Sequence, residues 1–175
     1  MVINCVLYRE GKRQEKVEIA DISEALKDDN AFIWLGLYQP EPEFMQQLQQ
    51  EFHLHELAIE DTLTAHQRPK VQQYGHSLFI AVNTAHLSNQ DEIVFGETHF
   101  FVGKNFLISV RQGPSESYAA IREKAEKNVD MLREGPGYAL YCILDFIVDN
   151  YGNIITSLSK RITDMEDNMF STEFN

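Results

Sequence analysis

The first part of the chain alternates short apolar runs with charged turns. Residues 2–8 are rich in β-forming side chains, Gly11 follows in a polar turn, and Val17 and Ile19 alternate with charged residues. This pattern predicts an N-terminal β-hairpin. Residues 31–37 are almost continuously apolar, which is typical of a strand covered on both faces.

Three short helical patterns lie between and after these strands. Asp21 can cap a short helix, with Glu24 as its capping-box partner. A second helix begins at Pro42, and residues 55–63 form the third pattern. The second helix is indicated by apolar side chains that recur along one face, namely Phe44, Met45, Leu48 and Phe52.

The middle of the chain has the pattern of several consecutive β-strands. Turn-forming residues 89–91 and 103–105 separate segments rich in Phe, Ile and Val. These segments predict three strands, at residues 78–82, 97–102 and 106–110.

The last third is helical. Ser115 can cap a polar, exposed helix that ends at about Leu132, and the sequence at 135–137 (Gly-Pro-Gly) breaks the chain. Residues 138–170 then carry one amphipathic pattern. A helix of this length measures about 50 Å at ~1.5 Å per residue. Because that exceeds a small domain, we expect its far end to pack against a partner subunit or another helix. Its apolar positions are Leu140, Leu144, Ile147, Tyr151, Ile154, Leu158, Ile162, Met165 and Met169.

Composition narrows the possible partners. The 175 residues include 27 acidic and 15 basic side chains, a net charge of −12. Such a protein is repelled by phosphate backbones, so nucleic acid is excluded as a partner and cations are favoured. Cys5 and Cys142 are too few for a disulfide framework and predict two core-packed thiols in a cytosolic protein. There is no signal peptide pattern, and no apolar run approaches the ~18 residues of a membrane span.

Carboxylates are the main chemical signal, since no catalytic or nucleotide-binding motif is present and an enzyme is not expected. Glu60 and Asp61 end a short helix, while Asp145 and Asp149 share one face of the long helix at i and i+4. Hard cations such as Mg²⁺ prefer these oxygen ligands. The pattern alone favours the alternative, in which these acids face solvent or pair with Arg or Lys.

Two further groups of residues have mainly structural interpretations. His53 and His55 could suggest zinc, but i and i+2 positions do not face each other on a helix, so a polar helix start is favoured. Arg68 and Lys70 flank Pro69 and could pair with nearby acids to support the structure.

Residues 57–70, LAIEDTLTAHQRPK, closely resemble the L-x-x-E-D-x-L-x-x-x-Q-R-P-K segment of CorA-type divalent-cation transporters. The similarity extends from Trp34 to residues 138–151. It implies an α/β fold, an α/β/α sandwich with a mixed sheet followed by a long amphipathic helix. It also implies that residues 1–134 form the cytoplasmic domain and that 135–175 begin a helical stalk, cut before the membrane spans and the Gly-Met-Asn pore motif.

The resemblance further implies a function and a site. The full-length protein would be a homopentamer at the cytoplasmic face of the inner (plasma) membrane that transports magnesium or cobalt. The membrane would be reached only through the missing C-terminal part. Regulatory Mg²⁺, with Co²⁺ or Zn²⁺ as possible substitutes, would bind between subunits. Asp61 matches the principal carboxylate, Glu60 and Asp145 match neighbours in a second site, and Asp149 is added because of its i+4 spacing.

Three alternatives remain open from the sequence. The ZntB-like, zinc-transporting branch shares this domain. A free-standing acidic α/β module could use the long helix to dimerise, with no metal role. A hydrolase using His66 and Asp61 lacks an accompanying nucleophile.

Overall fold

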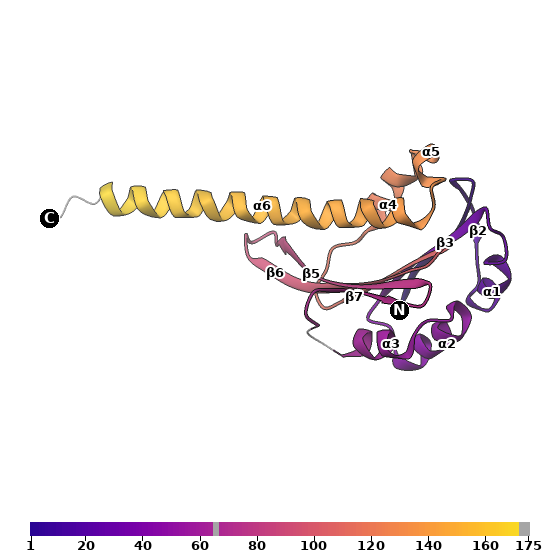
Figure 1. The fold of residues 1–175 in the computed structure, drawn as a ribbon. Helices are drawn as coiled ribbons and strands as arrows, with labels where there is room; N and C mark the ends of the chain where they lie inside the picture. Colours follow the sequence, from indigo (N-terminus) through magenta and orange to yellow (C-terminus); the bar gives the residue numbers. More distant parts are fainter. Residues whose placement is uncertain (65–66, 172–175) are drawn as a thin grey trace.

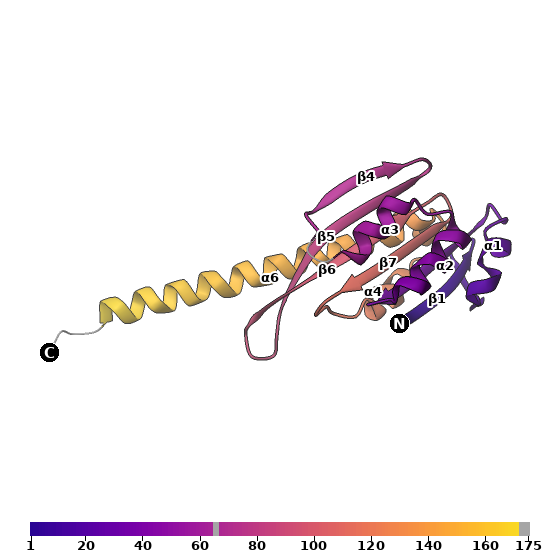
Figure 2. The same cartoon turned by 90° about the horizontal axis from the view of Figure 1, so that it is seen from below.

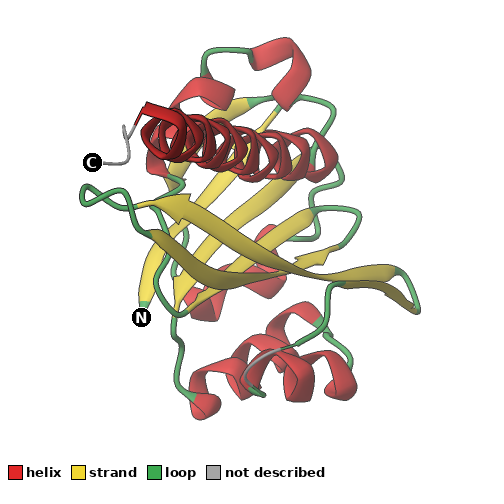
Figure 3. Ribbon diagram, turned by 90° about the vertical axis from the view of Figure 1, so that its left-hand side faces the viewer, coloured by secondary structure: helices red, strands yellow, loops and turns green. Residues whose placement is uncertain are grey.

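A seven-stranded mixed sheet lies at the centre of the molecule (Figures 1 and 3). The computed structural model describes residues 1–64 and 67–171. The strand order is β2-β1-β3-β7-β6-β5-β4. Only the β3–β7 pair among these neighbours is parallel. The strands are β1 (Val2–Arg9), β2 (Lys12–Lys16), β3 (Ala31–Tyr38), β4 (Lys70–Tyr74), β5 (Ser77–Leu87), β6 (Ile93–Val102) and β7 (Phe106–Gln112).

Helices cover both faces of the sheet. One face carries α1, α2 and α3, and the other carries α4, α5 and α6 (Figures 1 and 2). This arrangement confirms the expected α/β/α sandwich with a long C-terminal helix. The helices are α1 (Ile22–Ala25), α2 (Pro42–Phe52), α3 (Glu56–Leu63), α4 (Ala119–Glu126), α5 (Val129–Leu132) and α6 (Pro136–Ser171).

Strand β3 supplies side chains to two separate cores. Ile33 and Leu35 belong to the core beneath α1, α2 and α3, whereas Phe32 and Trp34 belong to the core beneath α4, α5 and α6. Successive side chains of a strand point to opposite faces. The nearly unbroken apolar run at 31–37 is therefore explained by coverage on both sides, as the sequence predicts.

The histidines after α2 have structural roles. His53 ends α2 in the left-handed conformation, at φ 54°. His55 caps α3, because its Nδ1 accepts a hydrogen bond from the backbone N–H of Leu57 at 3.2 Å. The interpretation as a polar helix start is therefore confirmed for His55, whereas His53 lies at the end of the preceding helix.

Two expected helices differ from the observed ones. Asp21 precedes α1, but its side chain makes no capping hydrogen bond and the helix has only four residues. The single exposed helix expected from Ser115 to Leu132 is wrong. Helix α4 begins after Tyr118, and Asn128 starts α5 by accepting a hydrogen bond from the N–H of Met131 at 3.4 Å. One face of this region is buried through Arg122, Ala125 and Leu132.

Helix α6 is continuous but is covered unevenly. It begins at Pro136, and the break lies at Gly135, which has φ +93°. Its sheet-packed part buries the apolar side chains of Ala139, Ile143, Ile147 and Ile154. Farther along, Ile162, Met165 and Met169 are each more than half exposed. The helix extends past the sheet (Figure 1), so no other element of the described chain covers this apolar end.

The two cysteines occupy different environments. Cys5 is buried in the first core, and burial raises the pKa of its thiol to about 11. Cys142 lies on α6, is only partly buried and packs against the second core. The expectation of core packing is therefore confirmed for Cys5 and only in part for Cys142. Within the described residues, no helix has an apolar stretch long enough to cross a bilayer.

The contact between the first hairpin and α5 generates a stability prediction. Gly11 has φ +74°, and a Cβ there would lie 2.1 Å from the carbonyl oxygen of Val129. Gly75 also has positive φ, +57°, but nothing lies within 4 Å of its added Cβ. We expect Gly11→Ala to lower the free energy of unfolding by more than about 2 kcal/mol and Gly75→Ala by about 1 kcal/mol. Urea denaturation of both variants measures the difference, and equal losses would contradict the contact.

Candidate carboxylate site

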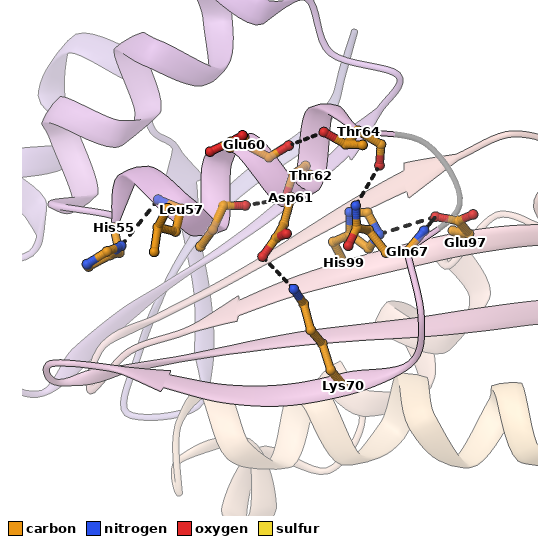
Figure 4. A network of polar contacts seen from close by, with 11 residues as sticks. His55, Leu57, Glu60, Asp61, Thr62, Thr64, Gln67, Lys70, Glu97 and His99 are labelled. Atoms are coloured by element: carbon orange, nitrogen blue, oxygen red, sulfur yellow. Dashed lines mark hydrogen bonds and ion pairs between the residues drawn. The ribbon is translucent and has the colours of Figure 1, made fainter.

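Asp61 forms an ion pair inside the chain. Helix α3 ends at Leu63, the chain returns through Pro69, and β4 then carries Lys70 beneath the helix. The Lys70 Nζ lies 2.6 Å from Asp61 Oδ2, and the two side chains are 32% and 23% exposed (Figure 4). The expectation that a basic residue beside Pro69 pairs with a nearby acid is confirmed for Lys70.

Glu60 takes a different direction from its neighbour. Its side chain is exposed, and Figure 4 shows its carboxylate turned away from Asp61 and Lys70. Consecutive helical residues are separated by about 100° around the axis. The hydroxyl of Thr64 donates to the carbonyl oxygen of Glu60 at 2.9 Å, which closes the end of α3. Glu60 and Asp61 are therefore adjacent in sequence but do not form a bidentate pair.

Asp145 and Asp149 lie on the opposite side of the molecule. Both are exposed on the sheet-packed part of α6, whereas Asp61 lies on α3 across the sheet (Figure 1). One chain therefore does not bring the four predicted carboxylates together. No group of three or more His, Cys, Asp or Glu side chains in the described part of the chain is placed to hold a metal ion.

A buried polar pair next to Asp61 was missed by sequence reasoning. His99 is fully buried on β6, and its Nε2 lies 3.4 Å from Glu97 Oε2. The same Glu97 oxygen accepts a hydrogen bond from the backbone N–H of Gln67 at 3.3 Å (Figure 4). Burial lowers the pKa of His99, and the negative charge of Glu97 partly opposes that effect. The available signal was a histidine directly before Phe100 in an apolar strand.

A large cleft adjoins this pair, with Glu97 in its lining. It has a volume of about 710 Å³ and is lined by the end of α3 together with parts of β5, β6 and β7. Arg68 and Glu97 are its charged residues, and none of the four predicted carboxylates lines it. The proposed hydrolase pair cannot be placed here, because His66 lies outside the described residues.

The sequence matches a known family over most of its length. A family model described as "CorA-like Mg2+ transporter protein" matches residues 29–175. The chain therefore belongs to the CorA-like Mg²⁺ transporter family, a family of transporters. It is 31% identical over 153 residues to the "Putative metal ion transporter YfjQ" of Bacillus subtilis, covering 87% of this chain and 44% of that protein.

A second relative has a lower identity. The "Cobalt/magnesium transport protein CorA" of Thermotoga maritima is 24% identical over 146 residues, covering 81% of this chain and 41% of that protein. The chain thus spans less than half the length of these two relatives. A transport activity of the whole protein is therefore treated as a proposal below.

Solved structures share the fold. The full-length CmaX protein superposes with a TM-score of 0.77 at 20% identity, covering 99% of this chain and 53% of that one. The soluble domain of CorA from Methanocaldococcus jannaschii gives 0.66 at 15% identity, covering 98% and 66%. The ZntB cytoplasmic domain from Vibrio parahaemolyticus gives 0.60 at 15% identity, covering 78% and 56%. At these identities the likeness shows the fold alone.

The buried histidine predicts a pH dependence of stability. Burial holds the pKa of His99 in the folded state below its usual value of about 6.5. As the pH falls through 6.5, the unfolded chain therefore binds a proton at this position more readily than the folded chain, and stability decreases. Between pH 7.5 and 5.5 we expect the wild type to lose more unfolding free energy than His99→Gln, by at most about 1.4 kcal/mol per pH unit. Parallel urea-unfolding profiles for the two proteins would contradict this role.

Proposed function

We propose that this chain is the cytoplasmic regulatory domain of a magnesium/cobalt transporter that senses Mg²⁺ through carboxylates at a subunit boundary. Family membership and the shared fold support a transporter domain. The metal-sensing role rests on the four carboxylates, of which Glu60, Asp145 and Asp149 are exposed. None of these three carboxylates forms an ion pair within the described residues.

The observation that carries the proposal is the surface around Asp145. Tyr141, Val148 and Ile155 are all more than half exposed on α6. Asp145 follows Tyr141 by four residues and precedes Val148 by three, so it lies within the same exposed stripe. An apolar stripe of this kind is typical of a surface that binds another protein. A carboxylate enclosed in such a contact requires a cation or a hydrogen-bond donor.

The ligand chemistry fits Mg²⁺ once a second subunit is added. Mg²⁺ commonly binds through one or two carboxylates and keeps several waters. Asp61 and Asp145 lie on opposite faces of one chain, so a shared site requires carboxylates from two copies. At Asp61 the cation would compete with the ammonium group of Lys70, which is 2.6 Å from Oδ2. That pair is partly exposed, and such pairs contribute roughly 0–1 kcal/mol.

The proposed regulation is electrostatic. In the family's pentamer, at the cytoplasmic face of the inner membrane, carboxylates of neighbouring domains repel one another. A bound divalent cation offsets this repulsion and favours the closely packed assembly, which corresponds to a closed pore. Loss of the cation shifts the population toward separated domains and an open pore, through the difference in cation affinity between the two assemblies.

Magnesium is favoured over zinc by the ligands available. The ZntB domain shares the fold, but zinc prefers nitrogen and sulfur ligands. The acids proposed here offer oxygen only, and His53 and His55 end and cap neighbouring helices. If the following experiment found no cation effect, it would favour a domain without a metal role.

The test separates metal binding from loss of the Asp61–Lys70 ion pair. Thermal unfolding and mass by light scattering are followed as Mg²⁺ is raised from an EDTA-treated sample, at constant chloride and ionic strength. We expect a saturable rise in melting temperature and in mass for the wild type. Asp61→Asn should reduce both effects, whereas Lys70→Gln, which breaks the same ion pair but keeps the carboxylate, should retain or strengthen them.

The α6 carboxylates have a matched control on the same helix. Asp145→Asn should weaken the Mg²⁺ response, and Asp164→Asn, an equal charge change on the exposed far part of α6, should not. If Lys70→Gln lost the Mg²⁺ response as fully as Asp61→Asn, the role of Asp61 would be structural. No response of the wild type to Mg²⁺, Co²⁺ or Zn²⁺ would overturn the sensing proposal for this chain.

A further inference from the structure

Arg122 is a buried charge for which the described residues supply no direct counter-ion. It projects from α4 toward the sheet and is only 6% exposed. Its guanidinium carbon lies 4.6 Å from the centroid of the Trp34 ring. Nη1 is buried without a hydrogen-bond partner, and within the part of the chain that the structure describes Arg122 forms no ion pair. Burying a guanidinium in this way is costly unless something compensates its charge.

A second arginine lies beside the same cavity. Arg111, on β7, is 8% exposed. It donates to the backbone carbonyl oxygen of Glu116, and its guanidinium carbon lies 5.4 Å from the ring centroids of both Tyr38 and Tyr118. Arg111 and Arg122 both line a small cavity between α4 and the sheet. The aromatic rings accommodate the flat cationic groups but supply no net negative charge.

Glu126, a candidate counter-ion on the same helix, is already engaged. Glu126 lies one turn along α4 from Arg122, and its Oε1 accepts hydrogen bonds from the Tyr8 hydroxyl at 2.6 Å and from Arg13 Nη1 at 3.1 Å. It therefore balances Arg13 directly and acts on Arg122 only at a distance. Burial lowers the pKa of Arg122 from its usual value, with the charge of Glu126 among the groups that oppose this. This direction agrees with incomplete compensation of its charge.

The space beside Arg122 results from the strand register. Asn4 of β1 is paired with Gly36 of β3, and Gly36 is paired with Ser109 of β7, so the three form one row across the sheet. Because Gly36 has no side chain, a cavity of about 40 Å³ remains between this row and α4. A Cβ at Gly36 would lie 3.5 Å from Arg122 Nη2 and 3.9 Å from Ser109 Oγ. The glycine thus leaves open the position next to the guanidinium.

We propose that this cavity binds a small monovalent anion, of the size of chloride. The volume suits one such ion, since a water molecule in liquid takes up about 30 Å³. Arg122 Nη1 is available as a donor, whereas the Ser109 hydroxyl already donates to the carbonyl oxygen of Leu35 at 3.4 Å. Asn4 Oδ1 is also buried without a partner, and rotating that amide presents its NH₂ group to the ion. A water molecule could occupy the same space but would leave the arginine charge uncompensated. This inference does not depend on the proposed transport function.

The test compares chloride with an anion too large for the cavity. The 175-residue chain is prepared free of chloride, and sodium gluconate is replaced by sodium chloride at constant ionic strength. We expect a saturable rise in melting temperature of about 5 °C. In ³⁵Cl NMR, we expect protein-dependent line broadening that saturates over the same concentration range.

The decisive variant is Gly36→Ala. Its methyl group occupies the space beside Arg122 Nη2 at an ordinary contact distance, so the fold should be kept while the ion is displaced. We expect it to lose both the chloride-dependent stabilisation and the line broadening. Gly137→Ala, which adds a methyl group in open space on α6, should keep both. Equal melting temperatures of the wild type in chloride and gluconate, or equal chloride effects in the wild type and Gly36→Ala, would overturn the proposal.

Discussion

The parallel pairing of β3 with β7 is the interaction on which the rest of the structure depends. It joins residues 31–38 to residues 106–112, and the chain between them supplies α2, α3 and three further strands. Because β3 and β7 lie in the middle of the sheet, both of their faces must be covered. The helices before β4 cover one face, and the helices after β7 cover the other. The same pairing sets the register that places Gly36 beside Ser109.

Much of the fold could be predicted from local pattern, because strands and amphipathic helices leave clear periodic signals. The helix expected from Ser115 to Leu132 was wrong because its polar composition hid both the break at Asn128 and the burial of Arg122. A guanidinium stacked on Trp34 is an arrangement that hydrophobic periodicity does not reveal. The long helix was predicted almost to its ends, since its period continues through covered and uncovered parts alike.

The arrangement of the candidate site was harder to predict from the sequence than the fold. The pairing of Lys70 with Asp61 could be anticipated, because only eight residues separate them, one of them a proline, and a return of the chain brings them together. The placement of Asp61 and Asp145 on opposite faces of the sheet could not be anticipated, because it follows from the strand order and not from the spacing of residues in the sequence. His99 was passed over because the apolar residues 100–102 that follow it dominate the strand pattern, although burial and Glu97 define its environment.

Helix α6 also has a mechanical consequence. Its 36 residues form one continuous rod, and only the part near the sheet is held by buried side chains. At ~1.5 Å per residue the rod is about 54 Å long, so a tilt of about 5° at its held end displaces the other end by roughly 5 Å. The molecule therefore contains a lever whose fulcrum is the packing of Ile143 and Ile147 on the sheet. Small changes on the sheet side become large displacements at the far end.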